Sequence, residues 1–151
     1  MPLSDTDIST ALTDDAHLGA PYPGRWNVPP YPDVDLAGGT GAVVADDPGI
    51  SVLAVDRADG RLLLVTDDGV HPVNGSLSAF VACAREYLEA RDAVTEIEDE
   101  GDAEWDEDGE EDAVAQIGLD LHRRFEAIDP VAVADENDFW AVAAEELGYG
   151  M

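Results

Sequence analysis

The spacing of apolar residues changes at Asn74-Gly75-Ser76, and this change limits the folds open to the chain. Before it, short segments rich in Val, Ile and Leu alternate with Asp, Gly and Pro, as in β-strands joined by turns. After it, apolar residues recur every three or four positions, the spacing of amphipathic helices. This order predicts an α+β fold in which a sheet comes first and helices pack on it.

The strand-like segments cover residues 42–45, 50–55, 61–66 and 69–73. Asp-Gly pairs separate the last three segments, and such pairs tolerate positive φ and favour tight hairpins. These three strands should therefore form an antiparallel meander. Turn chemistry accounts for the aspartate pairs without a metal. We expect an antiparallel or mixed sheet of about four to six strands.

Three main helices are expected to pack on this sheet. The first should begin after an N-cap at Asn74 or Ser76 and run to about Asp92. The second should end before Asp129-Pro130, with arginines in its last turn near the negative end of the helix dipole. The third should open near Asp135 and end at Gly148. The apolar faces are Leu77, Phe80, Val81, Ala84, Tyr87 and Leu88 in the first helix, Val114, Ile117, Leu121, Phe125 and Ile128 in the second, and Phe139, Val142, Ala143 and Leu147 in the third.

Residues 1–41 give weaker signals. A short helix is predicted over 5–12, and closely spaced prolines and glycines should break any regular element over 20–41. Trp26 and Tyr31 lie in this proline-rich stretch. They are expected to anchor it to the core rather than to line a ligand groove.

The net charge restricts the possible partners. The chain has 35 acidic residues against 7 basic ones, all arginine, and a formal net charge of -28. Such a charge repels phosphate backbones and anionic lipid headgroups, so we expect neither nucleic acid nor membranes, but a basic protein, as the partner. Hydrophobic residues make up 45% of the chain, which predicts one globular domain over 1–151. Because no apolar run approaches the roughly 18 residues of a bilayer span, we expect a cytoplasmic protein.

The acidic residues are densest between residues 96 and 112, where no basic residue occurs. Repulsion among these carboxylates predicts a mobile loop over 95–112. A calcium loop starting at Glu104 fails, because Ala115 occupies the position of the bidentate glutamate. Trp105 could anchor a partner or pack on the protein's own core. The predicted partner-binding residues are Glu98, Asp99, Glu100, Asp102, Trp105, Asp106, Glu107 and Asp108.

Residues suited to catalysis are sparse. His17, His71 and His122 lie in three separate segments, and no glycine-rich phosphate loop is present. The absence of lysine excludes Schiff-base chemistry. Cys83 lies in an apolar helical segment and is predicted to be a buried filler rather than a nucleophile. We expect no enzyme, no cofactor and no metal.

Several short motifs follow one another along the carboxyl-terminal two thirds of the chain. They are residues 50–56, 59–61, an N-x-S-L-x-x-F motif in 73–80, I-D-P at 128–130, F-W at 139–140, and E-x-x-Y-G at 146–150. The order of these motifs resembles the fourth subgroup of the SUKH superfamily, and the resemblance covers about residues 50–151. Departures are the proline-rich start, Gly75 in place of a small polar residue, and the acidic insertion before the penultimate helix.

This resemblance implies an immunity protein of a bacterial polymorphic toxin system. Such a protein is non-catalytic and binds a cognate toxin, often a nuclease or a deaminase. The family motifs look like folding determinants, with Asn74 and Ser76 as caps, Pro130 as a helix stop, and Phe139 and Trp140 in or near the core. Two alternatives remain open from the residues alone: a salt-adapted acidic protein of unrelated function, and a small ligand-binding regulatory module.

Overall fold

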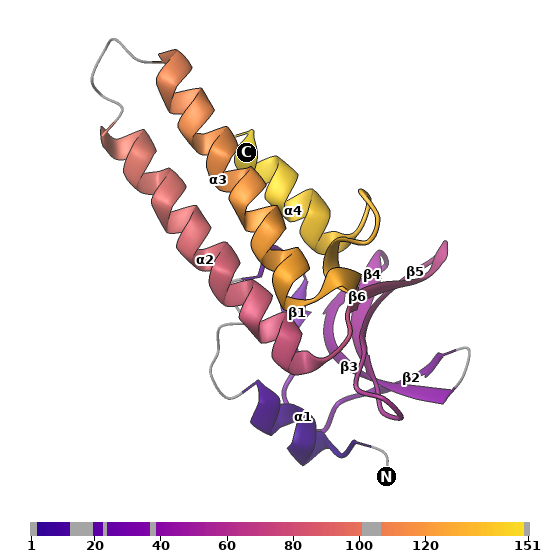
Figure 1. Cartoon of the computed structure of the whole chain (residues 1–151). Coiled ribbons are helices and arrows are strands. Elements are labelled where there is room, and N and C mark those ends of the chain that lie inside the picture. The colour runs from indigo at the N-terminus through magenta and orange to yellow at the C-terminus, as the bar shows by residue number, and fades with distance from the viewer. Residues whose placement is uncertain (1–2, 13–19, 23, 37–38, 101–106, 150–151) are drawn as a thin grey trace.

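The fold consists of a layer of strands beside a layer of helices (Figure 1). The computed structural model describes residues 3–12, 20–22, 24–36, 39–100 and 107–149. The two longest helices run side by side and extend away from the sheet, and a shorter helix packs beside them. The α+β class predicted from the change in apolar spacing is therefore confirmed.

Within the described ranges the sheet has six strands, and each pairing between them is antiparallel. The order is β1-β3-β4-β5-β6, with β2 also paired to β3. The four strands expected from the sequence are β3 to β6. The strand bounds are β1 Arg25–Trp26, β2 Asp33–Leu36, β3 Gly39–Asp47, β4 Ser51–Asp56, β5 Leu62–Thr66 and β6 Gly69–Asn74.

β1 and β2 correct the expectation that residues 20–41 hold no regular element. β1 pairs with Ala45 and Asp46, and β2 pairs with residues 39–42 at the other end of the same long strand. The prolines at 29, 30 and 32 fall between the two short strands, where no ladder hydrogen bond is lost. The prolines therefore lie between β1 and β2 and do not prevent either strand from pairing with β3.

The expected hairpin turns are present. Gly49 and Gly60 have φ angles of 78° and 80°, in the left-handed region that glycine adopts without a steric penalty. The amide of Gly60 also donates to the carbonyl oxygen of Asp56 at 2.7 Å. The Pro48-Gly49 and Asp59-Gly60 pairs thus reverse the chain without a ligand.

The amino-terminal helix α1, Asp5–Ala11, is held at both its start and its flank. Ser4 and Asp7 form a capping box at its first turn. The guanidinium of Arg57 donates to the carbonyl of Leu3 at 2.9 Å and to the Asp5 carboxylate at 2.7 Å. The short helix expected over 5–12 is confirmed, and it is fastened to the turn after β4.

The remaining helices are α2 Leu77–Glu100, α3 Glu107–Ile128 and α4 Phe139–Gly148, with a short 3₁₀ helix, η2 Pro130–Val133, before α4. α2 does not end near Asp92, and residues 95–100 and 107–112 are helical rather than a loop. Buried Val94 and half-buried Ile97 continue the apolar face of α2 past Asp92, which supports this extension. The described residues thus hold four α-helices, which are α1 and the three main helices expected.

Aromatic rings fill the space between the helices and the sheet. Trp140, Phe80 and Phe125 are fully buried, and the Trp140 ring lies 5.5 Å from Phe80 and 4.9 Å from Phe125 between centroids. Trp26 packs against this core and Tyr31 is buried, so both anchor the proline-rich stretch as predicted. The core thus joins the amino-terminal segment, the sheet and the helices.

A buried hydrogen-bond network fixes α4 relative to the sheet. The indole of Trp140 donates to the side-chain oxygen of Asn74 at 2.7 Å, and the Asn74 amide donates to Asp129 at 3.1 Å. The Asp129 carboxylate also accepts the backbone N–H of Gly75 at 2.7 Å. The N-cap of α2 is Ser76, whose hydroxyl accepts from the Ala79 amide, so the assignment of Asn74 as a cap was wrong.

Candidate functional site

The acidic residues predicted to bind a partner lie at one end of the molecule. Glu98, Asp99 and Glu100 are the last residues of α2, and Glu107 and Asp108 are the first of α3. These two helix ends are adjacent and point away from the sheet (Figure 1). Their side chains lie outside the described part of the structure, as do Asp102, Trp105 and Asp106 altogether.

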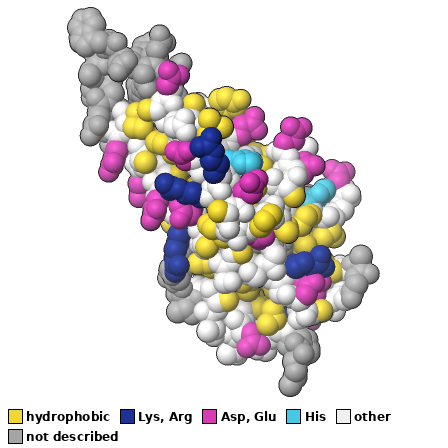
Figure 2. Space-filling model, viewed as in Figure 1, with side chains coloured by type: hydrophobic (Ala, Val, Ile, Leu, Met, Phe, Trp, Pro, Cys, Tyr) yellow, Lys and Arg dark blue, Asp and Glu magenta, His cyan; other side chains and the backbone are white. Residues whose placement is uncertain are grey.

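The described surface is rich in uncompensated acid. Arg57, Arg61, Arg123 and Arg124 each form an ion pair with a carboxylate of the same chain. Arginines are few, so most carboxylates are left to face solvent or a partner. Figure 2 shows acidic side chains over the helical and sheet parts of one face, with apolar side chains gathered between them.

The pair Arg124–Glu86 joins α3 to α2 at 3.1 Å, and Arg123 binds Asp120 one turn earlier on its own helix at 3.3 Å. Neither arginine lies in the last turn of α3, so the expectation that they sit at the negative end of the helix dipole was wrong. They instead connect helices or adjacent turns. Both pairs are largely solvent-exposed, and we expect each to contribute less than about 1 kcal/mol.

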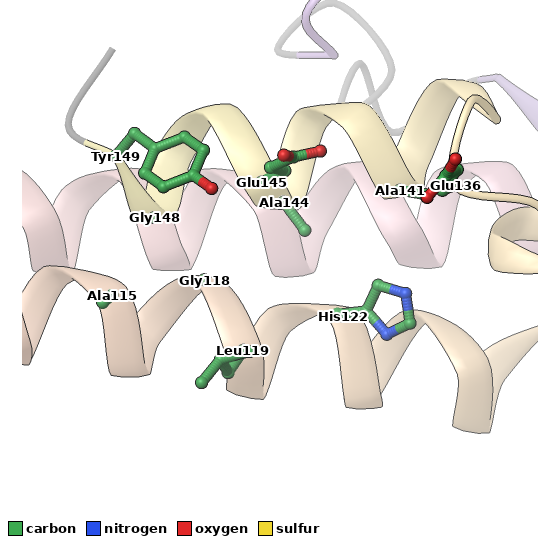
Figure 3. A pocket seen from close by; sticks show the side chains of 10 residues that line it. All are labelled: Ala115, Gly118, Leu119, His122, Glu136, Ala141, Ala144, Glu145, Gly148 and Tyr149. Carbon is green, nitrogen blue, oxygen red and sulfur yellow. The ribbon is translucent and has the colours of Figure 1, made fainter.

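An apolar cleft lies between α3 and α4, with a volume of about 320 Å³. Figure 3 shows its lining side chains along two neighbouring helices. Leu119 on α3 and Tyr149 at the end of α4 are 57% and 71% exposed, so both leave apolar surface in contact with solvent. The residues that line this α3–α4 cleft are Ala115, Gly118, Leu119, His122, Glu136, Ala141, Ala144, Glu145, Gly148 and Tyr149.

Small residues bring the two helices together below the cleft. A Cβ atom on Gly118 would lie 2.7 Å from the Cα of Gly148 and 2.8 Å from the carbonyl oxygen of Ala144. No real side chain tolerates such distances to backbone atoms, so this crossing requires glycine at 118. The sequence signal for the cleft is the recurrence of alanine and glycine at helical spacing in α3 and α4. The predicted helix faces were defined by large apolar residues and did not include it.

A second groove lies between the sheet and the start of α4, with a volume of about 920 Å³. Ile50, 66% exposed, and half-buried Phe139 give it an apolar part. Within the turn before α4, the carboxylate of Asp138 accepts the amide of Asp135, and Asp135 accepts the amide of Asn137, each at 2.8 Å. The acidic residues along this strand-side groove are Asp67, Asp68, Asp135 and Asp138.

The described histidines and the cysteine lie on different elements. No group of three or more His, Cys, Asp or Glu among them is placed to hold a metal ion. Cys83 is fully buried, and burial raises the pKa of its thiol to about 12, so the nucleophilic thiolate is scarce at neutral pH. His71 is on β6 and His122 on α3, whereas His17 lies outside the described residues.

The described residues form an α+β scaffold with hollows between α3 and α4 and beside the sheet, and the chain carries a large excess of acid. None of the helices in the described ranges combines the length and apolar character needed to cross a membrane. Neither the curated proteins nor the solved structures contain a match to this chain. A family model, SUKH-4 immunity protein, matches residues 10–146. Because this match spans most of the chain, the protein belongs to the SUKH-4 immunity protein family.

Proposed function

We propose that the protein is a non-catalytic cytoplasmic immunity protein that binds and neutralises a cognate toxin with a basic domain, such as a nuclease or a deaminase. The observation that carries this proposal is the family match over residues 10–146. The net charge of -28 supports a basic partner. A family role in immunity implies that the partner is a toxin. The acidic charge of this chain implies that the contact surface of that toxin is basic.

Inhibition follows from competition for the same basic surface. An enzyme that acts on nucleic acid binds phosphates with lysine and arginine, so a protein covered with carboxylates can occupy that surface and exclude the substrate. Long-range attraction also raises the association rate, by an amount that falls as salt rises. The internal ion pairs of the arginines described above leave most carboxylates available for this purpose.

The ends of α2 and α3 are proposed to contribute to the contact. These two helix ends lie at one end of the molecule, away from the sheet, and their sequence is dense in aspartate and glutamate. Trp105 lies between them in sequence and is proposed as an apolar contact ringed by acid. The proposed residues remain Glu98, Asp99, Glu100, Asp102, Trp105, Asp106, Glu107 and Asp108.

The test is neutralisation of the toxin domain encoded by the gene next to that of this chain. Purified protein should inhibit that domain at a 1:1 ratio and bind it with an association rate that drops at least tenfold between about 20 mM and 500 mM NaCl. Absence of both binding and inhibition would contradict the proposal. Unfolding at low salt with recovery in molar salt would favour the salt-adapted protein, and a thermal shift with one metabolite would favour the ligand-binding module.

A further inference from the structure

We propose that the α3–α4 cleft is the anchor site for the partner. It receives one large apolar side chain of the toxin, and a lysine or arginine beside that side chain pairs with the carboxylates on the rim. The inference rests on the proposed function, because it names the part of the surface that a basic toxin contacts most tightly.

The shape of the cleft suits a bulky side chain. Its floor is made by alanines and glycines, whose small side chains leave a volume of about 320 Å³. Leu119 and Tyr149 stand at its margin, where they remain largely exposed in the free protein (Figure 3). An aromatic or long aliphatic side chain inserted here would cover both and remove apolar surface from water at about 25 cal/mol per Å². Hot spots of protein interfaces have this form, a side chain in a pocket with a polar rim.

The negative charge on the rim of the cleft favours a toxin side chain that has a lysine or arginine beside it. Glu136 and Glu145 both line the cleft and are exposed, and no arginine is among its lining residues. A positive group beside the anchor would therefore meet carboxylates without displacing an internal ion pair. A second copy of the chain is a poor occupant, since both copies would carry a charge of -28.

The strand-side groove is less suited to anchor a partner. Ile50 is the exposed large apolar residue on its wall, whereas the α3–α4 cleft has two such residues. The carboxylates of Asp135 and Asp138 already accept backbone hydrogen bonds within their own turn. Its acidic residues fit a peripheral contact with a basic partner better than an apolar anchor.

The first experiment substitutes exposed residues, so that folding is preserved. Three variants alter the cleft at exposed positions. Leu119→Ser and Tyr149→Ser change its margin, and Ala115→Phe fills it. Val28→Ser is the matched control, because Val28 is 78% exposed and does not line the cleft. We expect each cleft variant to bind the neighbouring-gene toxin domain about 10 to 100 times more weakly than wild type, and Val28→Ser to bind within about twofold.

The charge of the rim is tested separately. Glu145→Gln should weaken binding about threefold to tenfold and reduce its dependence on salt, whereas Ile50→Ser should leave affinity within about twofold. Equal binding by wild type and all three cleft variants would overturn the inference while leaving the proposed function intact. A large loss with Ile50→Ser and none with Leu119→Ser would also overturn it, by placing the anchor in the strand-side groove. Failure of wild type to bind contradicts the proposed function itself.

A second experiment does not need the toxin. The tripeptide Ac-Lys-Trp-Lys-NH2 is titrated into the ¹⁵N-labelled protein and compared with Ac-Lys-Gly-Lys-NH2, which has the same charge. The tryptophan peptide should shift the amide signals of Gly118, Leu119 and Gly148, and Ala115→Phe should abolish these shifts. Shifts confined to Ile50 and its neighbours, or identical shifts with both peptides, would overturn the inference.

Discussion

At the scale of single residues, Asn74 connects more of the structure than any sequence motif suggested. Its side chain accepts from Trp140 on α4 and donates to Asp129 before η2, although these partners are 66 and 55 residues away. Both partners are buried, so loss of the amide leaves polar groups unpaired in the core. The penalty for an unpaired buried polar group is about 1–3 kcal/mol.

Replacing Asn74 by alanine should therefore lower the free energy of unfolding by about 2–4 kcal/mol, because it removes the hydrogen bonds to Trp140, Asp129 and Cys83 and leaves a cavity. Urea denaturation followed by circular dichroism measures this value. Ser76→Ala is the control, since it removes only the N-cap of α2 and should lower the free energy by about 1 kcal/mol. Equal losses for the two variants would contradict the role given to the buried network.

Cys83 gives a prediction with a defined pH dependence. Burial raises the pKa of its thiol from 9.0 to about 12, so the folded state keeps the proton that the unfolded state loses first. Stability from this group is fully present below pH 9 and is lost progressively as pH rises toward 12. A thiol reagent at pH 8 should label the native protein at least about 100 times more slowly than the protein in urea, and rapid labelling of the native protein would contradict the assignment.

At the scale of elements, the crossing of α3 and α4 depends on glycine. Gly118→Ala should lower the free energy of unfolding by about 1–3 kcal/mol, despite the better helix propensity of alanine, because the added methyl group overlaps the backbone of α4. Gly75→Ala is the matched control. A Cβ at Gly75 would meet Asp129 at 3.6 Å, an ordinary contact, and its unfolding free energy should change by less than about 1 kcal/mol. Thermal denaturation of both variants measures the difference.

Some of the strands and helices could be predicted from the sequence and others could not. The strands β3 to β6 and the turns at Gly49 and Gly60 were predictable, because segments rich in Val, Ile and Leu and turn pairs such as Pro48-Gly49 and Asp59-Gly60 act over a few residues. β1 and β2 were not, since each is defined by its partner β3 and not by its own residues. Repulsion within the acidic run was overestimated, because glutamate favours helix and the apolar face of α2 continues to Ile97.

The candidate site was less predictable than the fold. Acidic residues were easily found along the chain, but the α3–α4 cleft exists only because residues around 118 and 148 meet in space. Exposure is also a tertiary property, and nothing local distinguishes Leu119, which is exposed, from Leu121, which is buried. The sequence therefore predicted the charge of the surface and not its shape.

At the scale of the whole molecule, a charge of -28 acts against compactness through self-repulsion. Screening relieves this repulsion, so the melting temperature should rise by a few degrees between about 10 mM and 150 mM NaCl while the protein stays folded at both. Differential scanning calorimetry across this range checks the expectation. Loss of the folded state at 10 mM salt would indicate that the surface charge serves adaptation to brine.

The network of Asn74, Asp129 and Trp140 has a consequence for how such a protein changes over generations. The residues that hold α4 to the sheet are buried, whereas Leu119, Tyr149 and Glu145 on the cleft face solvent. Substitutions at exposed positions typically cost little folding stability. A lineage can therefore exchange the residues proposed to contact its target while the interior that keeps it folded stays as it is. The surface proposed for recognition can therefore change faster than the buried framework that supports it.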